Sequence, residues 1–281
     1  MMEKANAQNL SAENPEDKKE TVKKHKIINK NVRSSHITSG GGSQAGKYSE
    51  LVVGKRGLAA LIKYEFLTSA FCACPGAAGI ILRKIFYRFL FKKIGKGVVF
   101  GKNITIRHPN KIIIGDNVVI DENCMLDAKG TTNKGIEIKN SCYIGRNTIL
   151  SCKNGDIILE ENVNIGFNCE IQSSSHVSID KNTLIAAYVY IIAGDHLLNI
   201  EGQSASSAHG SSKGIVIGEN CWLGAKATVF DGVEIGHDTV IGASALVNNN
   251  IPPFSIAVGI PAKVIKNRLE EKKEANNTSE I

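Results

Sequence analysis

Between Phe100 and Val247 an apolar residue recurs every six positions, and this period restricts the fold more than any other feature of the chain. The most regular run of these residues is Ile217, Leu223, Val229, Ile235, Ile241 and Val247. A period of six fits neither the 3.6-residue turn of an α-helix nor the simple alternation of a flat strand. It is typical of short strands joined by regular corners, with one repeat on each side of a coiled solenoid. The pattern therefore predicts a β-helix.

Two further columns of residues agree with this register. Two positions before each repeat residue the side chain is small or β-branched, as at Val118, Cys142 and Thr183. Such residues suit a second inward position in a narrow core. Three positions after the repeat residue stand asparagines and one aspartate, which tolerate the left-handed backbone of a tight corner. These corner positions are Asn103, Asn117, Asn123, Asn147, Asn162, Asn168, Asn182, Asn220 and Asp238.

The interruptions of the repeat are also regular. Extra residues enter only after every third repeat residue, so three repeats form one turn of a triangular prism, and nearly all insertions leave from the same edge. A rigid stack of coils holds such loops in place, so we expect functional residues at this edge. The triplets are Ile94, Phe100, Ile106; Ile114, Ile120, Leu126; Ile138, Ile144, Leu150; Leu159, Ile165, Ile171; Ile179, Ile185, Ile191; Ile217, Leu223, Val229; and Ile235, Ile241, Val247.

Charge and polarity divide the chain into parts. Residues 1–93 carry 17 Lys and Arg against 7 Asp and Glu, whereas residues 94–281 carry 17 against 20, so the basic character belongs to the N-terminal third. The first residues are polar and lack an apolar run, which predicts disorder. The expected parts are a disordered tail and linker (1–47), a helical, basic and apolar segment (48–93), the repeat domain (94–268) and a short charged C-terminal extension (269–281).

The helical segment is open to two interpretations. Residues 66–82 carry no charge, and five cations follow among apolar residues, up to Lys93. The uncharged run is short and is interrupted by Pro75 and Gly76, so it is not expected to span a membrane. It could cover the open first coil, lie as a basic amphipathic segment on an anionic membrane face, or do both. No nucleic-acid-binding motif accompanies the cations, so no nucleic-acid partner is expected.

Two further features concern the compartment. No signal peptide is recognisable, which predicts a cytoplasmic protein, peripheral on the inner membrane face if the segment contacts lipid. The seven cysteines predict reduced core thiols rather than a disulfide framework or a metal site. The cysteines in the small inward column are Cys124, Cys142, Cys169 and Cys221.

The longest insertion lies between Ile191 and Ile217 and carries the strongest candidate for chemistry. It begins Ala193-Gly194-Asp195-His196 and continues through glycines, serines and a second histidine, His209. A histidine at the root of a polar loop can act as a general base near neutral pH. The alternative is an ordinary exposed loop histidine. The single tryptophan, Trp222, follows soon after the loop, and this combination favours the first interpretation.

Several C-terminal motifs resemble those of a known family. The motifs are Cys221–Ala225, Asp231–Gly236, Ile241–Ala243, Ile251–Pro253 and Val258–Ile265. They are similar to the hexapeptide-repeat acyltransferases, and most of all to the maltose, galactoside and polysaccharide O-acetyltransferases, over roughly residues 94–268. The resemblance implies a left-handed parallel β-helix, an exception to the right-handed crossover rule. It also implies a homotrimer with an active site at each subunit interface.

The same resemblance implies roles for the residues of the reaction. It places the general base at His196, with Asp195 beside it on the substrate side. It places the amide that stabilises the oxyanion at Ala225. Asn168 resembles an acceptor-binding asparagine, although it also belongs to the corner column.

For the cofactor, the resemblance implies binding of acetyl-CoA as co-substrate. Trp222 and Ala243 would border its pantetheine arm, with Ala243 one coil beyond Ala225. Lys263 and Lys266 match a basic pair that meets the phosphates. The chain departs from the family at residues 248–250, where three asparagines replace a common Thr-Lys-Asp, so one positive charge fewer is expected near coenzyme A.

The implied function is direct transfer of an acetyl group from acetyl-CoA to a hydroxyl of a sugar or surface-polysaccharide precursor, with no metal and no covalent intermediate. N-acetylation of an aminosugar nucleotide and a non-catalytic solenoid scaffold are alternatives. A γ-type carbonic anhydrase shares the solenoid, and His176 and His196 occupy equivalent positions in consecutive turns. However, no His-x4-His is present for a zinc triad.

Overall fold

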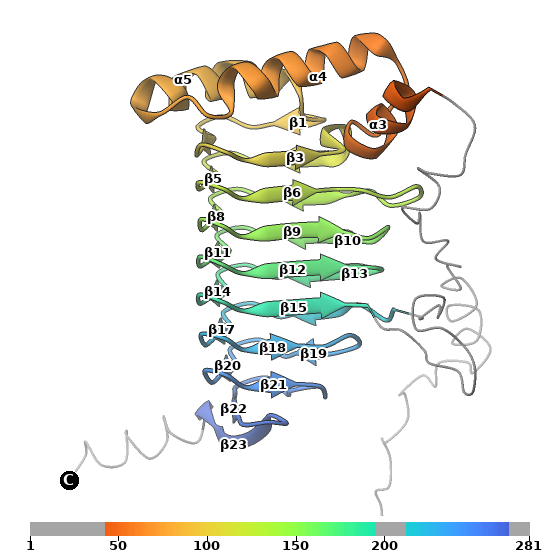
Figure 1. The fold of residues 1–281 in the computed structure, drawn as a ribbon. Helices are drawn as coiled ribbons and strands as arrows, with labels where there is room; N and C mark the ends of the chain where they lie inside the picture. Colours follow the sequence, from red (N-terminus) through yellow and green to blue (C-terminus); the bar gives the residue numbers. More distant parts are fainter. Residues whose placement is uncertain (1–42, 195–211, 270–281) are drawn as a thin grey trace, which may run out of the picture. The chain divides into compact units, whose positions relative to one another are not determined.

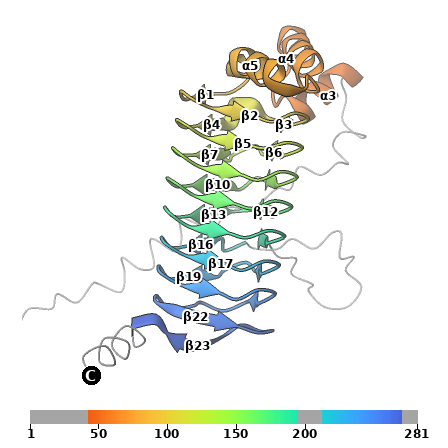
Figure 2. The same ribbon diagram turned by 90° about the vertical axis from the view of Figure 1, so that its left-hand side faces the viewer.

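A computed structural model describes residues 43–194 and 212–269, which all belong to one compact unit of the chain. The repeat region is the expected left-handed parallel β-helix, and helices lie at its N-terminal end (Figure 1). Each coil has three short strands, and equivalent strands of successive coils pair in parallel, as the side view shows (Figure 2). The result is three sheets, which we call A, B and C.

The strands of each sheet are consecutive coils of the solenoid. Sheet A contains β1 (Lys93–Ile94), β4 (Ile112–Ile114), β7 (Ile136–Ile138), β10 (Asp156–Leu159), β13 (His176–Ile179), β16 (Ile215–Ile217) and β19 (Glu234–Ile235). Sheet B contains β2 (Val99–Phe100), β5 (Val119–Ile120), β8 (Tyr143–Ile144), β11 (Asn164–Ile165), β14 (Leu184–Ile185), β17 (Trp222–Leu223), β20 (Val240–Ile241), β22 (Ser255–Val258) and β23 (Lys263–Asn267). Sheet C contains β3 (Thr105–Arg107), β6 (Met125–Asp127), β9 (Ile149–Cys152), β12 (Glu170–Ser173), β15 (Tyr190–Ala193), β18 (Thr228–Val229) and β21 (Leu246–Val247).

The predicted register is confirmed through the whole stack. Repeat residues of successive triplets are direct partners in the sheets, and the register is kept across the long insertion, where Ile179 pairs with Ile217. Every triplet residue is buried except Ile94, which is half-buried in the first coil. These side chains form one continuous core inside the prism. Its burial stabilises the coils through the hydrophobic effect.

The corners have the predicted left-handed backbone. All nine predicted Asn and Asp corners have φ between 55° and 60°. Their side chains also form hydrogen bonds from coil to coil, since the Asn162 amide donates to the Asn182 side-chain oxygen at 2.9 Å. Tyr188 and Lys226 occupy equivalent corners at φ 62°, although such residues rarely adopt this region.

All seven cysteines are free thiols, of which five are buried in the core, whereas Cys72 and Cys74 are only half-buried. Burial raises the pKa of Cys124, Cys142 and Cys221 to about 11, so these thiols stay protonated near neutral pH. The small inward column of the core contains four cysteines, namely Cys124, Cys142, Cys169 and Cys221.

Three helices form a cap on the first coil. They are α3 (Gln44–Val52), α4 (Leu58–Phe71) and α5 (Gly76–Phe86), followed by the 3-10 turn η1 (Tyr87–Phe89). The helix α3 begins four residues before the expected boundary, because the Ser43 side chain caps it by accepting from the Gly46 amide at 3.1 Å. No helix in residues 43–194 or 212–269 is long and apolar enough to cross a membrane.

Contacts between the cap and the solenoid are specific. The Tyr64 hydroxyl donates to the Ile106 carbonyl at 2.6 Å. Tyr87 and Phe91 each pack on the Phe100 ring with centroids 5.5 Å apart. Of the two interpretations left open for this segment, the structure therefore shows the first, a cover over the open coil.

Arg83 departs from its expected place among the surface cations. Its side chain is buried, and it forms no ion pair with an acidic residue within residues 43–194 and 212–269. The guanidinium donates to the Phe100 carbonyl at 3.0 Å and to the carbonyls of Phe71 and Cys74 at 3.0 and 2.7 Å. Phe71 ends α4, so the charge sits at the negative end of that helix dipole. Arg83 thus joins α4, α5 and the first coil.

We expect the substitution Arg83→Met to loosen the cap without unfolding the coils. The variant keeps an unbranched side chain but leaves buried carbonyls without a donor, which costs about 1–3 kcal/mol. Hydrogen exchange should accelerate at amides of α4 and α5 and stay unchanged in β10 and β13. The neighbouring exposed substitution Lys84→Met is the control, and equal effects of both variants would contradict a role for the guanidinium.

Candidate active site

The described candidates lie on sheet B and at the corner between sheets B and C, which we call the B–C corner. Trp222 opens β17, and its side chain is 52% exposed. Ala225 follows at the B–C corner and is exposed. The Ala227 amide donates to the Gly224 carbonyl at 3.1 Å, and Lys226 has φ 62°, which together define a tight turn around Ala225.

The turn leaves the Ala225 amide available to a ligand. A Cβ at Gly224 would lie 2.6 Å from the Ala243 nitrogen, so only glycine allows the two coils to approach so closely here. The Ala225 carbonyl accepts from the Ser244 amide at 2.8 Å. Within the described residues the Ala225 N–H has no hydrogen-bond acceptor. An N–H that has no acceptor and lies at an exposed turn can stabilise a developing oxyanion.

The two predicted phosphate-binding lysines lie at the C-terminal end of sheet B. The strand β23 turns back and pairs antiparallel with β22, and the register aligns Trp222, Val240, Ile256 and Lys266 across four neighbouring strands. Three strand spacings separate Trp222 from Lys266, roughly 14 Å. Lys263 pairs with Val258 near the other end of β23, and both lysines are exposed. The structure thus brings Trp222 and the lysine pair onto one sheet, with Ala225 and Ala243 along its corner.

The long insertion leaves a different corner, at the end of sheet C. Gly194 follows β15, and the chain returns to β16 at Ser212. Asp195 and His196 lie outside the described residues, as does His209. Within one chain, the strand β15 lies between the B–C corner and the root of this loop. Its four residues give a distance of about 13 Å between the two.

Asp231 holds the returning end of the loop. Its carboxylate accepts from the Ser212 hydroxyl at 2.8 Å and from the amides of Lys213 and Gly214 at 2.8 and 2.9 Å. The sequence marks Asp231 as part of a family motif, and the structure supplies its physical role. The loop therefore returns to the solenoid at a defined point one coil before Asp231.

Asn168 lies at the B–C corner, two coils from Ala225. It has φ 55°, and its side-chain oxygen accepts from the Asn147 amide at 2.9 Å. Its corner role is therefore visible in the structure. Sequence reasoning did not single out two aromatic neighbours: the Phe167 ring contacts the Tyr188 ring at 5.5 Å. Tyr188 could have been noticed, because it replaces asparagine in the corner column.

Metal binding receives no support from the described part of the chain. No group of three or more His, Cys, Asp or Glu side chains there could hold a metal ion. His176 is exposed at the start of β13, and a Cβ on Gly214 would lie 2.2 Å from its ring, so the next coil packs directly on the imidazole.

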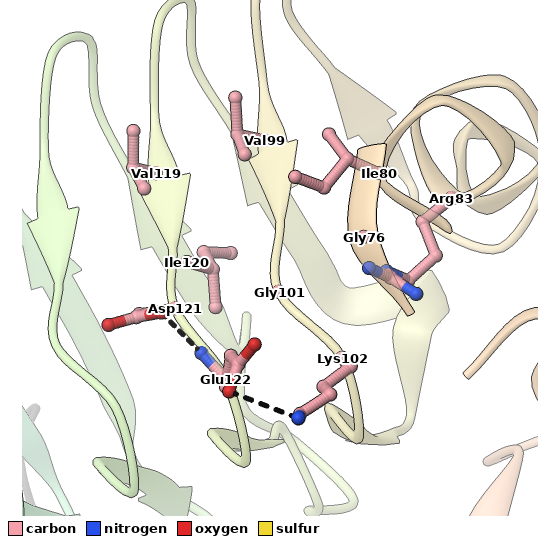
Figure 3. Close-up of a pocket in the computed structure, with 10 residues that line it drawn as sticks. All are labelled: Gly76, Ile80, Arg83, Val99, Gly101, Lys102, Val119, Ile120, Asp121 and Glu122. Atoms are coloured by element: carbon pink, nitrogen blue, oxygen red, sulfur yellow. Dashed lines mark hydrogen bonds and ion pairs between the residues drawn. The ribbon is translucent and has the colours of Figure 1, made fainter. Parts of the chain in front are cut away.

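One hollow of about 160 Å³ lies elsewhere, between α5 and the first two coils (Figure 3). Its polar wall contains Lys102 and Glu122, whose charged groups are 3.6 Å apart. The nearest strand of this wall, β5, is four strand spacings from β17 in sheet B, roughly 19 Å. The hollow is therefore separate from the candidate site.

Known proteins share the repeat. Residues 214–249 match the family described as bacterial transferase hexapeptide (six repeats), and residues 93–128 and 156–193 match the hexapeptide repeat of succinyl-transferase. Among solved structures, a maltose O-acetyltransferase from Clostridium difficile 630 is 23% identical, with a TM-score of 0.43, and the alignment covers 72% of this chain and 83% of that one.

Two relatives from Escherichia coli strain K12 are more similar in sequence. A protein provisionally named lipopolysaccharide biosynthesis O-acetyl transferase WbbJ is 34% identical over 126 residues, 42% of this chain and 64% of the relative. Galactoside O-acetyltransferase is 34% identical over 111 residues, 40% of this chain and 54% of the relative. The chain thus spans less than two thirds of either relative. Its repeat register and three-sided coils, together with these family matches and relatives, support a hexapeptide-repeat acyltransferase.

Proposed function

We propose that the protein is an O-acetyltransferase that moves an acetyl group from acetyl-CoA to a hydroxyl of a sugar or surface-polysaccharide precursor. The observation that carries this proposal is the Ala225 amide, which lies at an exposed tight turn three residues after Trp222 and has no hydrogen-bond acceptor among the described residues. The names of the two bacterial relatives, a galactoside and a lipopolysaccharide O-acetyltransferase, support the sugar acceptor. We place the reaction in the cytoplasm, at the inner face of the membrane.

The proposed reaction is a direct transfer. His196 takes the proton from the acceptor hydroxyl as the oxygen attacks the thioester carbonyl. The Ala225 N–H donates a hydrogen bond to the tetrahedral oxyanion, and the thiolate of coenzyme A leaves with a proton from the imidazolium. Trp222 and Ala243 border the pantetheine arm, while Lys263 and Lys266 bind the phosphates of coenzyme A. Asp195 and Asn168 are proposed to contact the acceptor.

A direct assay tests the proposal. Acetyl-CoA consumption should require a sugar acceptor, and the product should carry an ester, which alkali removes. Exclusive turnover of an aminosugar nucleotide, with an alkali-stable product, would replace O-acetylation by N-acetylation. If the protein does not bind coenzyme A at all, the non-catalytic scaffold is the remaining function. Hydration of CO₂ that depends on added zinc would indicate a carbonic anhydrase.

We also propose a homotrimer, in which two chains complete each candidate site. The amide of Ala225 and the root of the His196 loop lie at opposite ends of sheet C. Large apolar side chains are exposed on sheet B, namely Tyr143, Leu184 and Trp222, and they could pack against a second copy. A loop from that copy would bring its His196 to Ala225.

Light scattering should therefore give three times the subunit mass of 30.2 kDa. The substitution Leu184→Lys, in the strand next to Trp222, should dissociate the trimer and abolish turnover, because a buried unpaired charge is costly. Val216→Lys, at an exposed residue of sheet A, is the matched control and should keep both properties. A monomer at micromolar concentration that still turns over substrate would refute the trimer.

A further inference from the structure

The outward side of the cap is unusually apolar. On α4, Leu58, Ile62 and Phe66 follow one another at intervals of four residues and are 58–69% exposed. On α5 and η1, Ile81, Ile85 and Phe89 have the same spacing and are 48–56% exposed. Residues four apart lie on one face of a helix. We call these six residues the outer cap face.

The outer cap face is distinct from the face that holds the solenoid. The buried side chains of the same elements are Tyr64, Leu67, Arg83 and Tyr87. Tyr64, Arg83 and Tyr87 contact the first coil. The two helices also contact each other, since the Phe71 and Phe86 rings stack at 4.3 Å. Figures 1 and 2 show α4 and α5 lying together across the end of the coil stack. Their apolar stripes therefore belong to one end of the molecule.

Cations accompany this face. Residues 43–93 contain nine Lys or Arg against two Asp or Glu. Lys63 and Lys84 are exposed beside Ile62 and Ile85, and the Arg88 guanidinium lies 5.9 Å from the Phe89 ring centroid. Apolar side chains bordered by Lys and Arg are the pattern of a segment that lies in the interface of an anionic membrane.

Other occupants of the face fit less well. The undescribed ends, residues 1–42 and 270–281, are polar in sequence and offer no apolar run to cover it. A second copy packed face to face would bring two basic surfaces together, which like-charge repulsion opposes. An anionic lipid surface instead complements both the apolar stripes and the cations.

We infer that the outer cap face docks on an anionic membrane, with its apolar side chains between the headgroups and its cations at the phosphates. The solenoid then extends away from the lipid. In sheet B, β17 is five strand spacings from β2 in the first coil, roughly 24 Å. On the proposed function, on which this consequence rests, the acceptor is a lipid-linked glycan long enough to present its hydroxyl at that height.

Vesicle sedimentation tests the docking with the full chain and without acetyl-CoA or acceptor, so its result does not depend on the acetyltransferase proposal. The vesicles are phosphatidylcholine alone, or phosphatidylcholine with about a third phosphatidylglycerol, the fraction that supplies the negative surface charge. The protein should sediment with the anionic vesicles at low salt, less at high salt, and least with phosphatidylcholine alone. No binding to anionic vesicles at low ionic strength would overturn the inference.

Variants separate the two contributions. Ile62→Ser and Ile85→Ser, made together, should weaken the vesicle partition coefficient at least about tenfold, because two apolar side chains no longer leave water. Val216→Ser, at an exposed apolar residue of sheet A, is the matched control and should bind like the natural chain. Lys63→Gln, Lys84→Gln and Arg88→Gln together should abolish the preference for anionic vesicles.

Two outcomes would show that the face has another function. If the double serine variant binds vesicles as the natural chain does and unfolds at the same temperature, the outer cap face is excluded as the docking surface. A smaller particle in light scattering without vesicles, in the same variant, would show that the face joins copies of this chain instead. The triple glutamine variant leaves the apolar side chains intact, so it still tests the charge contribution if the serine variant does not fold.

Discussion

Acetyl transfer by the His196→Ala variant should be at least about a hundredfold slower than by the natural enzyme, which is the usual cost of losing a general base. The acceptor hydroxyl is a weak nucleophile until its proton is removed, and alanine cannot accept that proton. Coenzyme A affinity should stay nearly unchanged, because the proposed donor contacts come from sheet B and its corner. Steady-state kinetics and calorimetric titration with coenzyme A measure the two effects separately.

His209→Ala is the matched control for this prediction. It removes the other histidine side chain of the same insertion, so it measures any general effect of losing an imidazole from that loop. We expect it to retain most of the activity. A His196→Ala enzyme with natural rates would eliminate the proposed mechanism, and equal losses in both variants would indicate a disturbed loop rather than a missing base.

Turnover should fall about 10²–10³-fold in Ala225→Pro, since proline has no N–H to donate to the oxyanion. The turn itself should survive, because Lys226 has φ 62° and proline is common at the position before such a residue in a type II turn. The Ala225 carbonyl still accepts from Ser244 in this variant, so the link between the two coils is retained.

Ala225→Ser is the control for the proline variant. Serine retains the amide N–H at an exposed position, and its activity should remain within a few-fold of the natural enzyme. Both variants should show natural circular dichroism and particle size. A fully active proline variant would exclude the Ala225 amide from the mechanism, whatever the result for His196.

The two inactive variants together test whether the site is shared between subunits. In mixed trimers, a His196→Ala subunit still supplies the Ala225 amide, and an Ala225→Pro subunit still supplies His196. If the loop of one chain meets the B–C corner of another, co-expression should restore part of the activity. A site completed within one chain predicts no recovery, because each chain then lacks one of the two groups.

The solenoid could be predicted from the sequence because its information is local and repeated. Each hexad determines one side of the prism, and a shift of one residue would turn the whole inward column toward solvent. The corner asparagines mark the same register independently, since few residues other than glycine accept a left-handed backbone without strain. The family motifs near Trp222 and Ala225 are also contiguous in sequence.

The N-terminal helices required the tertiary structure. In sequence Arg83 looks like its neighbours Lys84 and Arg88, but the end of α4 and the first coil surround it with carbonyl groups. Likewise, periodicity alone did not separate Tyr64, which binds the first coil, from Ile62 and Phe66, which form the outer cap face. The helix α4 has apolar residues on all sides, so its orientation depends on its partners.

The arrangement of the candidate site was also a tertiary result. The motifs identify Trp222, Ala225 and the lysine pair, but the stacking of β17, β20, β22 and β23 places them along one sheet. The insertion that carries His196 begins at the opposite end of sheet C. A sequence determines which residues follow each other along a coil. The distance between two corners of the prism depends on how the three sheets close around the core, and this closure sets Ala225 and the loop root apart.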